Sequence, residues 1–224
     1  NYPTGTDNVA LGDTALDSIQ AGGTDNVAIG DHAGTAITTG DYNTIVGSDA
    51  LDANQTGIQN TAVGYQSLTT STASNNTAVG AYSMRDNTTG GNNVAVGISA
   101  LKENTEGDNN TSIGNSSLCN NTTGTDNTAV GHESLKANTT GNNNIAIGKN
   151  ALDANTSANY NTAVGGVSLT TNTTGCENTA LGYAALNLNL TGDKSVAVGY
   201  AALNKNTADN NTAVGHSSLA CNTT

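Results

Sequence analysis

The sequence predicts an all-β fold, a parallel β-solenoid of about thirteen coils of 17 residues that runs through residues 1–224 as a single tandem-repeat array. Two observations predict it: a five-residue motif recurs along the whole chain, and its period is too short for a pair of helices, which needs about 33 residues. The motif reads Asn-(Thr/Val)-Ala-(Val/Ile/Leu)-Gly. Its glycines are Gly12, Gly30, Gly47, Gly64, Gly80, Gly97, Gly114, Gly131, Gly148, Gly165, Gly182, Gly199 and Gly215.

Each repeat is numbered here from the motif asparagine at position one, so that the motif glycine stands at position five. The residues at positions two to four favour a short β-strand, which the glycine closes. Ser/Ala-Leu at positions eight and nine predicts a second short strand. Asn-Thr-Thr-Gly at positions 12 to 15 predicts a turn whose glycine takes positive φ. Two coils have 16 residues and lack this glycine (Asn60 to Asn75 and Ser195 to Asn210), which predicts a tighter turn without a left-handed residue.

The alternation of a strand places positions two and four on one face and position three on the other. We assign the bulky residues, Val or Ile at position four and Leu at position nine, to the coil interior. Position three then forms an outward ladder of small side chains, on which the backbone of another copy can pack closely. This expected assembly face consists of Ala62, Ala95, Ala129, Ala163 and Ala197.

The asparagine at position 12 opens an Asn-x-Ser/Thr sequon in eight coils. These residues are Asn54, Asn87, Asn121, Asn138, Asn155, Asn172, Asn189 and Asn222. Two interpretations stay open: stacked side chains that hydrogen-bond as an Asn ladder, or glycosylation sites. Either one places the row at a solvent-facing edge.

Composition limits the function. Hydrophobic residues make up 35% of the chain, aromatic residues 3%, and Phe and Trp are absent, so any core must be narrow. A net charge of −12 with only six Lys and Arg excludes a nucleic-acid partner. No apolar run approaches the roughly 20 residues of a membrane span. Asn1 is not a Met and the chain stops inside a repeat, so we expect a segment of a longer fibre.

Catalysis needs unique polar groups that converge, whereas a solenoid repeats one residue type at each level. The three histidines, His32, His132 and His216, stand coils apart, and Cys119, Cys176 and Cys221 occupy three different repeat positions. We therefore expect no catalytic residue, metal site, cofactor or intrachain disulfide. Tyr65, Tyr183 and Tyr200 directly follow a motif glycine, which favours packing at the coil rim or, alternatively, a surface for sugars.

Runs such as Ser195-Val196-Ala197-Val198-Gly199 and Asn26-Val27-Ala28-Ile29-Gly30 resemble the head repeats of trimeric autotransporter adhesins. The longer form at Asn60 to Leu68 is similar to repeats of phage and viral tail fibres. The resemblance covers essentially the whole chain and implies a left-handed β-roll, a homotrimer and an attachment role. The Asn-Thr-Thr-Gly turn makes these coils longer than the adhesin repeats.

The expected function is that of an extracellular fibre or adhesin segment, at a cell or virion surface, that assembles into a homotrimer or filament and presents or spaces an attachment function. Its further partner would be a cell-surface receptor or carbohydrate. Ice binding is the alternative, because threonine recurs at position two, although Val9, Val27, Val94, Ile145 and Val196 interrupt the row. An acyltransferase built on hexapeptide repeats needs coils of 18 residues and does not fit.

Overall fold

The computed structural model describes residues 5–222 and confirms the predicted fold class. The described residues form thirteen three-residue strands joined by turns, and they contain no helix. The chain divides into two compact units, Asn1–Asn109 and Asn110–Thr224. The N-terminal unit contains β1 (Val9–Leu11), β2 (Val27–Ile29), β3 (Thr44–Val46), β4 (Thr61–Val63), β5 (Thr77–Val79) and β6 (Val94–Val96). The C-terminal unit contains β7 (Thr111–Ile113), β8 (Thr128–Val130), β9 (Ile145–Ile147), β10 (Thr162–Val164), β11 (Thr179–Leu181), β12 (Val196–Val198) and β13 (Thr212–Val214).

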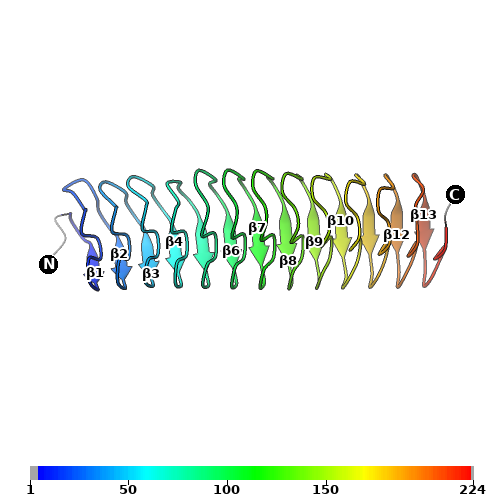
Figure 1. Ribbon diagram of the computed structural model, residues 1–224, viewed down its shortest axis with the longest axis horizontal. Helices are drawn as coiled ribbons and strands as arrows, with labels where there is room; N and C mark the ends of the chain where they lie inside the picture. The colour runs from blue at the N-terminus through cyan, green and yellow to red at the C-terminus, as the bar shows by residue number, and fades with distance from the viewer. Residues whose placement is uncertain (1–4, 223–224) are drawn as a thin grey trace. The chain divides into compact units, whose positions relative to one another are not determined.

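Within each unit the strands lie side by side in chain order and all pair in parallel (Figure 1). Every pair is in register by repeat position, as in the pairing of Ala163 with Ala180 between β10 and β11. One strand is therefore one level of a β-solenoid, and each side chain stands beside the residue at the same repeat position of the next coil.

The second strand predicted at positions eight and nine does not form. Residues at positions seven, nine and 17 instead take left-handed backbone angles, for example Glu133 (φ 55°), Leu135 (φ 52°) and Asn143 (φ 56°). These turns still bond from coil to coil, because the Glu133 amide donates to the Asn115 carbonyl (3.0 Å) and the Leu135 amide to the Ala151 carbonyl (2.9 Å). Hydrogen bonds between coils offset the steric cost of the left-handed angles, which sequence propensity alone would have excluded.

The turn glycine at position 15 also plays a different role from the one predicted. The left-handed residue of this turn is the last residue of the coil, at position 17 in a full coil, and both short coils keep it as their sixteenth residue, in Asn75 (φ 63°) and Asn210 (φ 60°). Ala158 stands at position 15 of a full 17-residue coil, so the lack of glycine does not by itself shorten a coil. The prediction of a short turn without a left-handed residue was therefore wrong.

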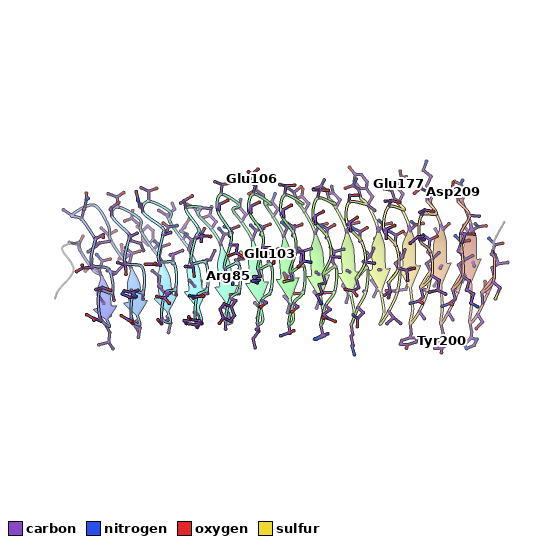
Figure 2. The ribbon with its side chains drawn as sticks, viewed as in Figure 1. Arg85, Glu103, Glu106, Glu177, Tyr200 and Asp209 are labelled. Atoms are coloured by element: carbon purple, nitrogen blue, oxygen red, sulfur yellow. The ribbon has the colours of Figure 1, made fainter. Side chains whose placement is uncertain are left out.

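The side chains of the C-terminal unit project from two edges of the coil. Tyr200, at position six, lies along the edge where the strands end (Figure 2). Glu177 and Asp209, the last and the next-to-last residues of their coils, lie along the opposite edge, which the turns form (Figure 2).

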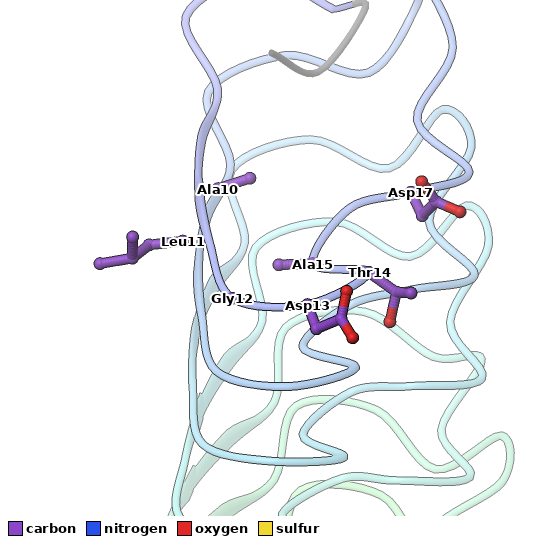
Figure 3. Close-up of a pocket in the computed structure, with 7 residues that line it drawn as sticks. All are labelled: Ala10, Leu11, Gly12, Asp13, Thr14, Ala15 and Asp17. Atoms are coloured by element: carbon purple, nitrogen blue, oxygen red, sulfur yellow. The ribbon is translucent and has the colours of Figure 1, made fainter. Parts of the chain in front are cut away.

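The assignment of the strand faces was wrong, because the structure reverses it. The alanines expected on an outward assembly face are fully buried inside the coil. They are Ala62, Ala95, Ala129, Ala163 and Ala197. Position four is the outward residue, with Val96 37% and Leu11 67% exposed. In the first coil, Ala10 and Ala15 point toward each other while Leu11 points away (Figure 3).

The limited space inside the coil explains why alanine, and not valine, points inward. The interior already holds the leucine at position nine, such as Leu135 or Leu169, which was correctly assigned to the core and is 0% exposed. A coil one side chain deep has room beside that leucine for a methyl group but not for a second large side chain. The second coil tests this account, because Gly34 replaces its leucine. There Ile37, from the turn, and Ile45, at position three of the next coil, are both buried and fill the space, with each Cδ1 within 3.1 Å of where a Cβ of Gly34 would lie.

The motif glycine has no substitute at position five. At Gly131, φ is +131° and an added Cβ would lie 2.7 Å from the carbonyl carbon and oxygen of Gly148 in the next coil. We expect Gly131→Ala to lower the free energy of unfolding by at least about 2 kcal/mol, through backbone strain and this contact. Urea denaturation followed by circular dichroism measures the loss.

Gly166→Ala is the matched control. Gly166 does not have positive φ, and its added Cβ would make ordinary contacts of 3.4 and 3.5 Å with the Tyr183 ring. We expect its stability to change by less than about 0.5 kcal/mol. Equal losses in the two variants would contradict the special role of position five.

Candidate functional site: the outer strand face

The outward side chains at positions two and four form one surface along the strands of each unit, called here the outer strand face. Position four is Val, Ile or Leu in every coil. In the C-terminal unit the row consists of Ile113, Val130, Ile147, Val164, Leu181, Val198 and Val214, each exposed or half-buried. A continuous row of exposed and half-buried aliphatic side chains differs from leucines scattered singly over a surface and makes this face the candidate site.

Position two of the same face mixes threonine with aliphatic residues. In the C-terminal unit this row consists of Thr111, Thr128, Ile145, Thr162, Thr179, Val196 and Thr212. Strand pairing places neighbouring members side by side, as in Thr162 with Thr179. In the two rows of the C-terminal unit nine side chains are therefore aliphatic and five carry a hydroxyl group, and none carries a charge.

The predicted asparagine row lies inside the coil, so its placement at a solvent-facing edge was wrong. Seven of the eight residues are 0% exposed, namely Asn54, Asn87, Asn121, Asn138, Asn155, Asn172 and Asn189, and Asn222 is half-buried. The Nδ2 of Asn138 donates to the Oδ1 of Asn121 in the preceding coil (2.8 Å), and that of Asn155 donates to the Oδ1 of Asn138 (2.9 Å). Of the two interpretations, the structure therefore contains the Asn ladder.

Asn104 and Asn206 belong to the same ladder although neither opens a sequon. The Nδ2 of Asn104 donates to the Oδ1 of Asn87 (2.7 Å), and that of Asn206 donates to the Oδ1 of Asn189 (3.4 Å). Asparagine at position 12 thus persists where the threonine of the sequon is missing. Alignment on repeat position would have found these two residues, whereas a search for sequons misses them.

A second buried ladder at position one was not predicted. The Oδ1 of Asn127 accepts from the backbone amide of Asn144 in the next coil (3.0 Å), and its Nδ2 donates to the Gly141 carbonyl (2.8 Å). The same carbonyl accepts from the Nδ2 of Asn138 (3.0 Å). Two asparagine amides therefore bind the position-15 carbonyl and tie the turn to the start of the strand. In residues 5–222, no buried side-chain nitrogen or oxygen lacks a hydrogen-bond partner.

A third row, half exposed, runs along position 16. The Asn142 amide donates to the Oδ1 of Asn159 (2.7 Å), and the Cys176 amide donates to the Oδ1 of Asp193 (2.7 Å). Cys176 occupies this row, where its Sγ accepts from the Asn159 amide (3.4 Å). Asp or Asn after the turn glycine is the sequence signal for this row.

The ionisable side chains form local surface pairs. A hydrogen bond with Asp49 raises the pKa of His32, and one from Lys136 lowers the pKa of Glu133. Burial raises the pKa of Asp153. No cluster of three or more His, Cys, Asp or Glu that could hold a metal occurs in the described part of the chain.

Cys119, Cys176 and Cys221 form no disulfide, and they are buried, half-buried and exposed in that order. No helix among residues 5–222 is long and apolar enough to cross a membrane. A hollow opens at the first coil, lined by Ala10, Leu11, Gly12, Asp13, Thr14, Ala15 and Asp17 (Figure 3). It is a level of the coil interior that no further coil covers in the described residues.

The chain matches no protein-family model, and no curated protein or solved structure is detectably similar to it. The fold and its surfaces therefore carry the functional argument.

We expect Asn138→Ala to destabilise the C-terminal unit. The substitution removes the partner of the Asn121 Oδ1 and one donor to the Gly141 carbonyl, and it leaves the Nδ2 of Asn155 without its acceptor at Asn138. Each buried polar group left unpaired costs about 1–3 kcal/mol. Thermal unfolding measures the loss, and Asn115→Ala, an exposed asparagine, is the control. Equal melting temperatures for the two variants would show that the ladder contributes nothing.

Burial of the ladder also predicts that the folded chain carries no glycan at its buried sequons. The Asn121 and Asn138 amides are enclosed in the coil, where an attached sugar cannot fit. Intact-mass analysis of the folded protein, secreted from a host that glycosylates, should give the unmodified mass at these sites. A folded product modified at Asn138 would contradict the inward placement of the row.

Proposed function

We propose that this chain is a segment of an extracellular structural fibre or adhesin, which associates with copies of itself through the outer strand face and presents or spaces an attachment function. The observation that carries the proposal is the row of exposed and half-buried aliphatic side chains at position four, one in every coil. A face without charges and with a fixed repeat is complementary to an identical face on another copy.

The composition of the coil supports association. Most levels bury one leucine, one alanine and small polar side chains, whereas the larger aliphatic residue at position four is exposed or half-buried. Burying a Val, Leu or Ile side chain contributes about 1.5–3 kcal/mol. Because the position-four side chains are still partly exposed in the single chain, a second buried surface would add part of that contribution at each level.

A homotrimer fits this surface, since three copies can each turn one face toward a common axis and leave the charged edges in water. The resemblance to adhesin head repeats and fibre repeats agrees with that arrangement and with a location at a cell or virion surface. A filament of copies uses the same face. The attachment target would be a cell-surface receptor or a carbohydrate.

Ice binding is the second candidate, favoured by the side-by-side threonines at position two of the outer strand face. Hydroxyl and methyl groups at fixed strand spacing can order water. The two functions compete for one face, because a face buried between copies is closed to ice. Thermal hysteresis from a monomeric chain would support ice binding and would contradict assembly through this face.

We expect Leu181→Glu combined with Ile147→Glu to disrupt assembly. The two side chains are 47% and 39% exposed in the single chain, so the coil itself tolerates a charge there. Two carboxylates per copy facing an identical surface would be buried without partners. Sedimentation velocity at micromolar concentration should show an oligomer for the natural chain and a folded monomer for the variant.

Leu188→Glu is the matched control, because Leu188 is 42% exposed but lies at position 11, outside the outer strand face. It should leave the oligomer intact. The proposal fails if the natural chain is a stable folded monomer, or if Leu188→Glu dissociates the oligomer as fully as the double variant.

A further inference from the structure

A row of side chains at position six crosses the C-terminal unit along the edge where the strands end, and Tyr200 marks it in Figure 2. Its last five members are Lys149, Gly166, Tyr183, Tyr200 and His216. At each step the position-seven amide of one coil donates to the position-six carbonyl of the preceding coil, at 2.8 to 3.0 Å. These hydrogen bonds hold the five residues in consecutive levels.

Three rings of this row form a continuous stack. The ring centroids of Tyr183 and Tyr200 are 5.5 Å apart with 15° between the planes, and those of Tyr200 and His216 are 5.0 Å apart with 8° between the planes. The stack stands in water, since Tyr183 is 54% exposed. Stacking on Tyr200 restrains the ring of Tyr183, so a ligand that stacks on the other side of Tyr183 would find a surface already ordered.

Gly166 leaves one level of the row empty beside this stack. It is the only glycine at position six. A Cβ added at Gly166 would lie 3.4 and 3.5 Å from the Cδ2 and Cε2 of the Tyr183 ring. One side of the Tyr183 ring therefore borders a level without a side chain, whereas the other side stacks on Tyr200.

Lys149 occupies the level on the far side of the gap. Its side chain is exposed and makes no ion pair within residues 5–222, in a chain with a net charge of −12. Val167, beside Gly166 at position seven, adds an uncharged, half-buried wall. The level of Gly166 thus lies between the level of an aromatic ring and the level of a lysine whose ammonium group makes no ion pair in the described residues.

We propose that this gap binds a six-membered sugar ring that carries a carboxylate. The C–H face of the pyranose would stack on Tyr183 in the level left empty by Gly166, and its carboxylate would pair with the Nζ of Lys149. An aromatic ligand needs enclosure to be desolvated. A sugar needs an aromatic ring against only one of its faces, while the hydroxyl groups around its rim stay hydrated. The exposed edge of the coil allows both.

The inference gives the attachment function proposed above a ligand class, and it does not require the chain to assemble. Position six lies outside the outer strand face, so binding can be measured on the oligomer and on the monomeric Leu181→Glu, Ile147→Glu variant. Binding by both with an intact oligomer supports the two proposals separately. If the natural chain proved monomeric but still bound the sugar, only the proposal of self-association would fail.

The probes are methyl β-D-glucuronide and methyl β-D-glucoside, which differ only in the carboxylate. Titrations followed through the tyrosine ring resonances should show both binding, with the glucuronide tighter by about two- to fivefold, because an exposed ion pair contributes little. Lys149→Gln should reduce the affinity for the glucuronide to that for the glucoside. Tyr183→Ala should weaken binding of both by about tenfold or more.

Gly166→Tyr tests the gap itself, since it places a fourth ring in the empty level and should abolish binding of both sugars. Most coils carry a side chain at position six, so the fold accepts this change. Asn115→Tyr adds a ring in the same row away from the gap and should leave both affinities unchanged. Absence of glucuronide binding to the natural chain, or unaltered affinity in Gly166→Tyr or Tyr183→Ala, would overturn the proposal.

Discussion

The buried asparagine amide is the group on which the stacking of coils depends. Its nitrogen and its oxygen both need partners away from water. At position 12, the coil itself supplies the turn carbonyl for Nδ2, and the neighbouring coil supplies the second partner, as between Asn138 and Asn121. A coil that lost its neighbour would leave half of these bonds unmade. Each level is therefore complete only in the array, and the repeat spacing must stay nearly constant.

A core only one side chain deep follows from the same geometry. Leucine at position nine reaches the centre from a left-handed residue, and alanine at position three completes the layer from the strand. In the second coil, Gly34 replaces the leucine, and Ile37 and Ile45 fill the space around it. The buried side chains of a level must therefore fill a nearly constant volume. Side chains larger than this layer must point outward, which places Val and Ile of position four in water.

Sequence periodicity was sufficient to predict the solenoid, the parallel strands at positions two to four and the buried leucine. It was insufficient for the strand faces, because alternation separates Ala129 from Val130 but does not say which one is inside. Hydrophobicity favoured valine, whereas the limited space selected alanine. Left-handed angles at Glu133 and Leu135 were not predictable from propensity either, since they are maintained by bonds to other coils. The ladder at position one was missed because strand formation was considered there without the hydrogen-bonding needs of Asn127.

The corrected faces strengthen the argument for self-association and change the residues that carry it. An alanine ladder on the surface would have offered close backbone approach with little apolar area. The actual face offers one Val, Ile or Leu side chain per level, in register along the strands. Burial against another copy would contribute at each level and would therefore grow with the number of coils, while the translational entropy lost on association is lost once per copy. A long array of weak, identical contacts thus favours a stable assembly, although each coil contributes little alone.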